Sequence, residues 1–469
     1  MTVLAIDQGT SGTKAIVVDE SGGVVGLAEV PVHPRYLDGG AVEQDPAQLL
    51  ESVLNAGRAA IAQAGRPIEA ISLANQGETV LAWDRATGAP LSTAIVWQDR
   101  RAEALCAGLA GHAEALAART GLVLDPYFSA PKMAWLRRNG ETGGVVTTSD
   151  TWLLHQLTGA FVTDATTASR SLLVELGATD WDPELLSLFG LDGEELPAIV
   201  GNDEMIGSTT VFGSDTPVGG VVVDQQAALL AEACLQPGMA KCTLGTGAFL
   251  LANTGTAGVR STAGLTSSVA WRIAWADTFC VDGQVYTAAS AVRWLSSLGL
   301  IAGAEQIDAV AAEDSCGVFC VPALAGLAAP WWKPQATATL AGMTLSTERG
   351  HLVLAVLQGI AAQIAELVTA IDADAPSPLS RLRVDGGLTQ SRVLMQACAD
   401  IAGVPVDVYP SPHATALGAA ALARLSLDPR RPLADVVGPW APSASYEPRW
   451  TATRAAEFRQ RWRELAAAS

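Results

Sequence analysis

The stretch GGVVVDQQAALLAEACLQPGMAKCTLGTGAF, from Gly219 to Phe249, places an aspartate, a helix stop and a glycine-rich turn in close succession. Three valines at 221–223 predict a short buried strand, and apolar residues at helical spacing predict a helix over 225–235. Asp224 is therefore expected at a strand-to-helix junction. An isolated aspartate in that position is most often a helix N-cap.

The second part of this stretch predicts a hairpin. Residues 236–238, Gln-Pro-Gly, stop the helix, and residues 241–244 enter a strand that turns through Gly245, Thr246 and Gly247. Glycine lets the backbone come within hydrogen-bonding distance of a ligand, and a run of backbone N–H groups suits phosphate oxygens. A carboxylate and a phosphate-binding turn are therefore expected to face one cleft.

Two further glycine turns lie at predicted strand ends. The first is Gly9 to Gly12 in DQGTSGTK, with Asp7 at its start, and the other is Gly386 and Gly387. Each turn alone is most often an ordinary connection, but their joint occurrence with Asp7 and Asp224 favours a phosphate site. Because both halves contain a hairpin with a small-residue turn, the sequence indicates duplication of one fold.

Capping residues and periodicity predict the remaining elements. The expected strands include 2–6, 13–18, 24–30, 71–74, 80–83, 248–253, 381–384 and 404–408. The expected helices run from Asp45 to Gly65, over 102–118, from 125, over 150–157 with Asp150 as cap, and over 351–371, 389–401, 415–425 and 453 onward; 162–171 is expected to be a polar loop.

Length and composition predict a globular protein of two domains or slightly more, because 469 residues are too many for one ordinary core. Hydrophobic residues make up 49% and charged residues 16%. The net charge of −19 disfavours nucleic acid and anionic membranes as partners, since such a surface repels phosphate groups. The negative net charge does not exclude ATP as a ligand, because ATP binds together with Mg²⁺ and backbone N–H groups can hold its phosphates.

The sequence predicts a cytoplasmic location. No basic leader precedes Asp7, which argues against a signal peptide. The longest apolar candidate for a membrane span, residues 318–332, is broken by Pro322 and Pro330. The seven cysteines are scattered and odd in number, which suits a reducing compartment.

Segments over nearly the whole chain resemble the FGGY carbohydrate kinases, and within that family the glycerol kinases. The similar segments are LAIDQGTSGTK, VEQDP, ISLANQGETVLAWDRATGAPLSTAIVWQDRRA, DPYFSAPKMAWLRRN, DATTASRSLL, VVVDQQAAL, GMAKCTLGTGAFLLANTG, LRVDGGLTQSRVLMQ and ATALGAAALA. Residues 127–139, YFSAPKMAWLRRN, fit the family's N-terminal signature position by position.

The resemblance implies an α/β fold of two actin-like (ribonuclease-H-like) domains with a catalytic cleft between them. Residues 1–237 would form the N-terminal FGGY domain, which binds substrate and phosphate. Residues 238–427 would form the C-terminal FGGY domain, which binds ATP, and residues 428–469 a C-terminal helical tail.

The same resemblance implies ATP-dependent phosphorylation of a hydroxyl of a small polyol or sugar, either glycerol or a somewhat larger polyol. Asp224 would be the general base, and Asp7 would hold Mg²⁺. ATP would lie against Gly9, Thr10, Ser11, Lys14, Gly245, Thr246, Gly386, Gly387 and Ser391. The implied substrate residues are Gly77, Glu78, Trp97, Tyr127, Asp224, Gln225 and Phe249.

One position departs from the glycerol kinases, which have arginine where this chain has Gly77. Loss of a charged hydrogen-bond donor costs about 1.5–3 kcal/mol, so either glycerol binds weakly or the space admits a larger polyol or sugar. Two alternatives remain: a pentulose kinase of the xylulose or ribulose type, and a non-catalytic ATP-gated sensor on the same fold. Homodimers and homotetramers are common among similar proteins.

Overall fold

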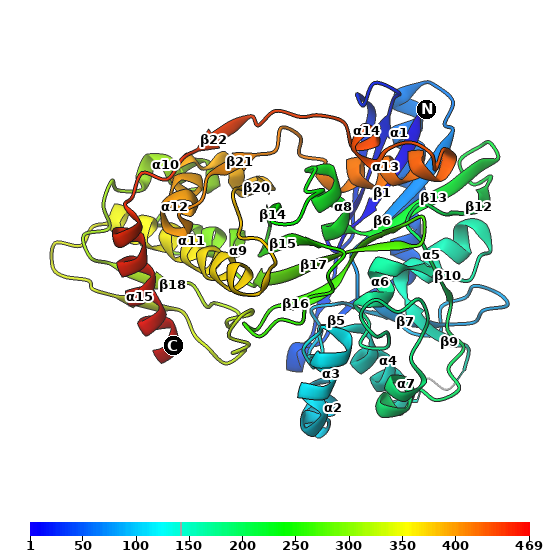
Figure 1. The fold of residues 1–469 in the computed structure, drawn as a ribbon, viewed down its shortest axis with the longest axis horizontal. Helices are drawn as coiled ribbons and strands as arrows, with labels where there is room; N and C mark the ends of the chain where they lie inside the picture. The colour runs from blue at the N-terminus through cyan, green and yellow to red at the C-terminus, as the bar shows by residue number, and fades with distance from the viewer. Residues whose placement is uncertain (141–142) are drawn as a thin grey trace.

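Two mixed β-sheets organise the chain, one in each lobe of the computed structural model, which describes residues 1–140 and 143–469 (Figure 1). The first has the order β12-β13-β6-β1-β2-β3, with β1 Val3–Gln8, β2 Gly12–Val18, β3 Val24–Pro31, β6 Ala70–Asn75, β12 Met205–Thr209 and β13 Thr216–Val223. The second has the order β16-β17-β15-β14-β20-β21-β22, with β14 Ala240–Leu244, β15 Ala248–Gly255, β16 Thr266–Ile273, β17 Ala276–Val285, β20 Leu382–Asp385, β21 Val406–Val408 and β22 Ala444–Tyr446.

The five central strands of the two sheets share one arrangement, as expected for duplication of one fold. In the first, β1 pairs antiparallel with β2, which pairs antiparallel with β3, while β6 and β13 continue from β1 in parallel. In the second, β14, β15 and β17 form the antiparallel series, while β20 and β21 continue from β14 in parallel. The carboxyl ends of β1 and β14 therefore both lead into a glycine turn that faces the other lobe.

A smaller sheet and several short helices extend the first lobe. The sheet has the order β4-β5-β8-β7-β9, with β4 Arg35–Tyr36, β5 Val42–Gln44, β7 Val80–Trp83, β8 Ala94–Ile95 and β9 Val145–Thr148. A separate strand pair is β10 Val162–Asp164 with β11 Ala198–Val200. The helices are α2 Glu103–Gly108, α3 Ala113–Thr120, α4 Ser129–Arg138, α5 Ser149–Thr158, α6 Ala165–Ser169 and α7 Pro183–Phe189.

Local capping signals place the longer helix of the first lobe. In α1, Pro46–Ala64, the Asp45 side chain accepts a hydrogen bond from the Ala47 N–H, and Gly65 ends the helix in the left-handed conformation. Both helix ends were predicted from these residues. The buried face of α1 packs on β2 and β3.

The second lobe is built around α11, Arg349–Asp374. This helix is long and apolar enough to cross a membrane, which the sequence-based search overlooked, but 89% of its most apolar window is buried in the lobe. Helix α8, Asp224–Ala231, directly follows β13 of the first sheet. The later helices include α9 Ala289–Ser297, α10 Ile307–Val310, α12 Arg392–Ala402, α14 Leu433–Val437 and α15 Ala452–Ala468. A short strand pair is formed by β18 Phe319–Val321 and β19 Thr339–Ala341.

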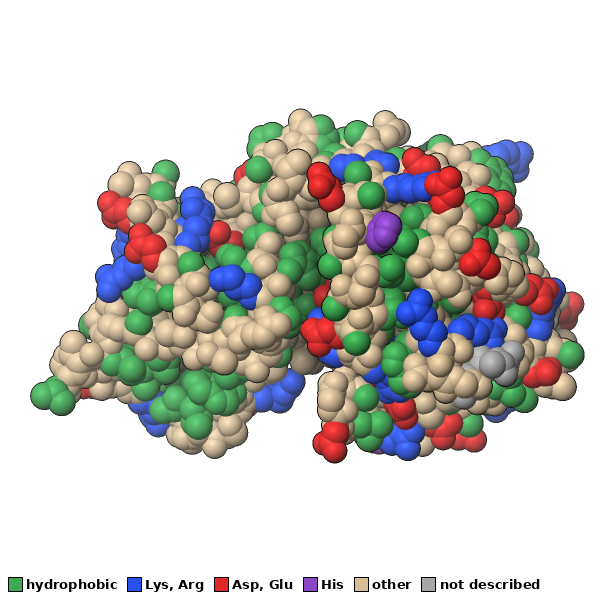
Figure 2. Space-filling view, turned by 90° about the horizontal axis from the view of Figure 1, so that it is seen from below, with side chains coloured by type: hydrophobic (Ala, Val, Ile, Leu, Met, Phe, Trp, Pro, Cys, Tyr) green, Lys and Arg blue, Asp and Glu red, His purple; other side chains and the backbone are tan. Residues whose placement is uncertain are grey.

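The lobes meet over a shared interface. Helix α13, Ala414–Leu427, lies within the second predicted domain but packs on β1, β6 and β13 of the first sheet, as Figure 1 shows beside the blue strands. Figure 2 shows a notch between the two lobes at the lower edge of the face seen there. The domain boundaries 1–237, 238–427 and 428–469 stay predictions.

Four local predictions for the first lobe, apart from those at the cavity, were wrong. The helix expected over 102–118 is interrupted between α2 and α3, where Gly108 and Gly111 weaken helical continuity. The expected loop 162–171 contains β10 and α6 instead. The helix expected from Asp125 begins at Ser129. Asp150 lies inside α5 and accepts a hydrogen bond from the Thr163 hydroxyl at 2.7 Å, so it is not the cap.

Candidate active site

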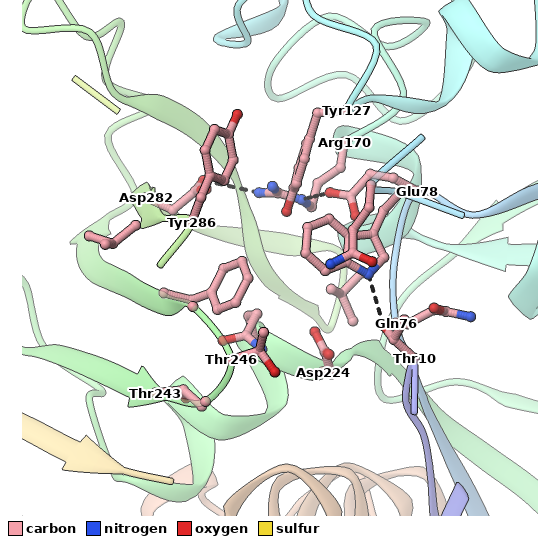
Figure 3. A pocket seen from close by; sticks show the side chains of 18 of the residues that line it. Thr10, Gln76, Glu78, Tyr127, Arg170, Asp224, Thr243, Thr246, Asp282 and Tyr286 are labelled. Carbon is pink, nitrogen blue, oxygen red and sulfur yellow. Dashed lines mark hydrogen bonds and ion pairs between the residues drawn. The ribbon is translucent and has the colours of Figure 1, made fainter. Parts of the chain in front are cut away.

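A cavity of about 520 Å³ lies between the lobes, and side chains from both line it (Figure 3). Ten of the residues predicted for the site line this cavity: Thr10, Ser11, Glu78, Trp97, Tyr127, Asp224, Gln225, Gly245, Thr246 and Phe249. These residues are far apart in the sequence, and folding brings them to one place. The cavity therefore joins the predicted substrate side and the predicted phosphate side.

Asp224 lies at the floor of the cavity as the first residue of α8. The N-cap is Val223, so the interpretation of Asp224 as an N-cap was wrong by one position. The predicted continuation of this helix to residue 235 is also too long, because α8 ends at Ala231. Burial raises the pKa of Asp224, while nearby Lys241 opposes that rise.

A buried lysine, Lys241, supports the part of the cavity lining next to Asp224. Its side chain is fully buried on β14, and its ammonium group donates to the Gln225 side chain and, at 2.8 Å, to the Thr243 hydroxyl. Gln225 and Thr243 both line the cavity. A buried ammonium therefore orients two polar lining groups next to Asp224.

Asp7 lies on β1, opposite Lys14 of β2. The prediction placed it in the turn, but β1 continues to Gln8. Loss of hydration and the neighbouring carboxylate of Asp224 raise the pKa of Asp7 to about 7. One Oδ atom of buried Asp385 also has no hydrogen-bond partner among residues 1–140 and 143–469. A cation between these carboxylates would relieve their repulsion.

The donor set suits Mg²⁺ better than a metal held by protein alone. In the described part of the chain, no group of three or more His, Cys, Asp or Glu side chains is arranged to hold a metal ion. Mg²⁺ commonly binds through one or two carboxylates and completes its shell with water and substrate phosphates. Asp7, at the mouth of the first glycine turn, fits that pattern.

Two turns present backbone and hydroxyl donors to the cavity. In the β1–β2 turn, the Gly9 N–H donates to the Gly12 carbonyl at 3.0 Å, which leaves Thr10 and Ser11 at the tip. The β14–β15 turn contains Gly245 and the exposed Thr246. The carbonyls of this second turn accept hydrogen bonds from the N–H groups that begin α9, so the turn is fixed in place.

Three aromatic rings, those of Trp97, Tyr127 and Phe249, form an aromatic wall of the cavity. Trp97 packs edge-on against Tyr127 and Phe249, with ring centroids 5.5 and 5.9 Å apart. The buried ammonium of Lys132 donates to the carbonyls of Pro126, Tyr127 and Phe128, which holds the Tyr127 segment. Such a wall suits the carbon edge of a polyol.

The turn after β6 aims Glu78 into the cavity. Gly77 and Glu78 both have left-handed backbones, with φ of 69° and 47°. Gly77 does not line the cavity, and a Cβ added there would lie 3.3 Å from a methyl group of Val223, which does line it. A non-glycine residue in this conformation is strained, and such strain commonly occurs at functional sites.

Prediction from sequence missed Arg170 and Asp282, which also line the cavity. Arg170 follows α6 and forms ion pairs with Glu78 and with Asp282 of β17 (Figure 3). The segment DATTASRSLL, which contains Arg170, was part of the resemblance and was the available signal. Other unpredicted lining residues include Tyr36, Gln76, Gln98, Arg100, Gln226, Thr243 and Tyr286.

Several predicted nucleotide residues lie outside the cavity. Gly386 follows β20, and a Cβ there would lie 2.5 Å from the Leu244 carbonyl oxygen, so only glycine fits beside β14. The Ser391 hydroxyl donates to Asp308 at 2.6 Å and accepts from the Leu394 N–H that begins α12. Contacts of Gly386, Gly387 and Ser391 with adenosine stay predictions, as do those of Lys14 and Gly9 with phosphate.

Comparison with known proteins agrees with this arrangement. Residues 2–231 match the N-terminal domain and residues 240–427 the C-terminal domain of the FGGY family of carbohydrate kinases. A glycerol kinase of Bordetella parapertussis is 44% identical over 98% of this chain and 96% of its own length.

Solved structures share the whole fold. A Plasmodium falciparum glycerol kinase with ADP has a TM-score of 0.93 and 32% identity, covering 100% of this chain and 98% of its own. A xylulose kinase from Rhodospirillum rubrum has a TM-score of 0.87 and 26% identity, with coverage of 100% and 98%.

Proposed function

The chain belongs to the FGGY family of carbohydrate kinases, and we propose that it transfers the γ-phosphoryl group of ATP to a hydroxyl of glycerol or a somewhat larger polyol. It is a phosphotransferase that acts on an alcohol group. The glycerol kinases to which it is similar support glycerol as the first substrate to test.

One observation carries this proposal: Asp224 lies on the cavity floor between the Thr246 turn and the aromatic wall (Figure 3). A carboxylate there can accept the proton of a hydroxyl that is held against Trp97 and Tyr127. The two glycine turns lie where the transferred phosphoryl group would be bound. Phosphoryl transfer needs mainly such positioning and charge stabilisation.

Asp224 acts as the general base in this mechanism. The start of α8 stabilises its charged form through the helix dipole, while burial raises its pKa toward that of a useful base. The Gln225 amide group can donate hydrogen bonds to the other hydroxyls, and the Glu78 carboxylate can accept hydrogen bonds from them. The hydroxyls of Thr10, Ser11 and Thr246 and the N–H groups of their turns contact the phosphates.

Asp7 would hold Mg²⁺, directly or through water. When bound there, Mg²⁺ would supply positive charge that offsets the charge of the phosphates. The chain's own contribution is the position of Asp7 at the end of β1, opposite Lys14, which brings a carboxylate and an ammonium to the same turn. A cytoplasmic location and assembly as a homodimer or homotetramer are further proposals from the sequence and the resemblance.

A coupled ADP-release assay tests the function. With Mg·ATP, the panel is glycerol, erythritol, ribitol, xylitol, D-xylulose and D-ribulose. Turnover on glycerol or on a four- or five-carbon polyol supports the proposal, and preference for a pentulose supports the ketose-kinase alternative. Absence of turnover on every compound, with ATP still bound, would favour the sensor.

A further inference from the structure

Arg170 projects into the cavity between the two lobes (Figure 3). Its Nε donates to Glu78, and its Nη1 donates to Asp282 at 3.0 Å and to the Ser268 hydroxyl at 3.4 Å. Nη2 has no hydrogen-bond partner within residues 1–140 and 143–469. The guanidinium therefore keeps two donor hydrogens for a ligand.

This guanidinium is fixed in position. The side chains of Arg170, Glu78 and Asp282 are 6%, 2% and 7% exposed. The rings of Tyr127 and Phe128 lie 5.7 Å from its central carbon. Burial opposes the charge, but the two carboxylates outweigh it and raise the pKa of Arg170 further. A rigid, charged donor loses little entropy when it binds a ligand.

Among residues 1–140 and 143–469, Arg100 is the other cation that lines the cavity. Both of its Nη nitrogens already pair with carboxylates, Nη1 with Asp125 at 2.7 Å and Nη2 with Glu103. Gly77, in the turn after β6, has no side chain that could supply a cation. In the described part of the chain, Arg170, which follows α6, therefore offers a polyol hydroxyl a guanidinium Nη group that has no other partner.

We propose that Nη2 of Arg170 donates to a hydroxyl of the polyol and so decides which polyols bind, and that Asp282 is a positioning residue that holds this guanidinium. The inference rests on the proposed function, because it specifies how the same cavity recognises its substrate. Glu78 takes a double role, since one of its oxygens accepts from Arg170 and the other is left for a substrate hydroxyl.

Substrate analogues test the proposed contact. Wild type and Arg170→Lys are compared with glycerol, 1,2-propanediol and 1,3-propanediol by kcat/KM and, with Mg·AMP-PNP present, by calorimetric Kd. We expect Arg170→Lys to lose about 10- to 100-fold in affinity for glycerol, the effect of a lost charged hydrogen bond. The loss should be markedly smaller for the diol that lacks the contacted hydroxyl, because its partner is already absent.

Arg272→Lys is the matched control. Arg272 is also buried and pairs with an aspartate, Asp277 at 2.6 Å, but it does not line the cavity. Its substitution should affect the three compounds equally. An equal loss on all three for Arg170→Lys as well would overturn the contact.

Asp282→Asn tests the positioning role separately. It should raise KM for the polyol several-fold with KM for ATP unchanged, and add little to Arg170→Lys in the double variant. Additive losses would overturn the role of Asp282. If polyols bind with this Arg170 dependence but no phosphate is transferred, the proposed kinase function fails and the inference stands; if no polyol binds, both fail.

Discussion

The indole Nε1 of Trp97 donates a hydrogen bond to the Thr10 hydroxyl at 2.8 Å. This bond connects the aromatic wall of the polyol side with the first phosphate turn. Trp97 follows β8 of the smaller sheet, whereas Thr10 lies between β1 and β2. The proposed polyol and phosphate sites therefore contain groups that position one another.

Trp97→Phe should weaken both substrates together. The ring contacts with Tyr127 and Phe249 remain, but the donor to Thr10 is lost, and a neutral hydrogen bond contributes about 0.5–1.5 kcal/mol. We expect KM for ATP and for the polyol each to rise about 2- to 10-fold. Trp181→Phe is the control, since it removes an indole bond to the Pro197 carbonyl at 2.7 Å outside the cavity. A rise in only one KM would contradict the coupling.

Asp224→Asn should lower kcat by a factor of about 10² to 10⁴, the usual contribution of a general base. The amide cannot take the hydroxyl proton, although the shape of the cavity floor is kept. ATP affinity, measured by calorimetry, should change little. Asp215→Asn, an exposed loop aspartate, should leave kcat unchanged. Retained turnover in Asp224→Asn would refute the base assignment.

Gly77→Arg should improve kcat/KM for glycerol if a cation at this turn reaches the substrate. The left-handed backbone and the contact with Val223 impose a cost of about 1–3 kcal/mol on any side chain here. Gly77→Ala has the same backbone cost without the guanidinium and is the reference. Both variants should melt at lower temperature, and only Gly77→Arg should gain on glycerol. Equal kcat/KM in the two variants would mean that position 77 does not act on substrate.

Glu232→Gln should stabilise the protein at neutral pH. Glu232 is fully buried at the end of α8, and neither carboxylate oxygen has a hydrogen-bond partner in the described part of the chain. Burial, with a smaller contribution from Asp385, raises its pKa well above the usual value. The folded protein therefore retains a proton that the unfolded chain releases above about pH 4.3.

The sign of the pH dependence follows from this linkage. Because the folded state binds more protons, the Glu232 contribution makes stability fall as pH rises from about 4.3 toward the folded pKa. The melting temperature of Glu232→Gln should match wild type near pH 4 and exceed it increasingly at higher pH. Glu51→Gln, at an exposed position of α1, should track wild type throughout. A constant difference at every pH would count against a buried, proton-binding Glu232.

Trp462→Ala should destabilise the second lobe by about 3–5 kcal/mol, as for other buried aromatic residues. Trp462 of α15 is fully buried, and its indole donates to the Cys320 carbonyl at 2.8 Å. Chemical denaturation would measure the loss, and limited proteolysis should cut the C-terminal tail faster. Trp275→Ala, which removes a ring that is 62% exposed, should change stability little. Equal stability of both variants would show that the tail is not anchored through Trp462.

Local sequence signals were enough to predict most helices and strands. Asp45, Pro46 and Gly65 mark the two ends of α1, because capping and left-handed stops depend on neighbouring residues only. The hairpin with Gly245 and the junction at Asp224 were found for the same reason. Where local signals conflict, as in 162–171, packing against the rest of the fold decides, and the loop prediction was wrong there.

The amino-acid sequence was thus sufficient to identify the family and to predict the duplicated hairpins and ten residues that line the cavity, since all of these depend on short motifs. Only the tertiary structure decided that Arg170 meets Glu78, 92 residues away, and Asp282, 112 residues away. Such a buried ion pair has no local signature, because its partners are desolvated and brought together only when two distant segments close on one another.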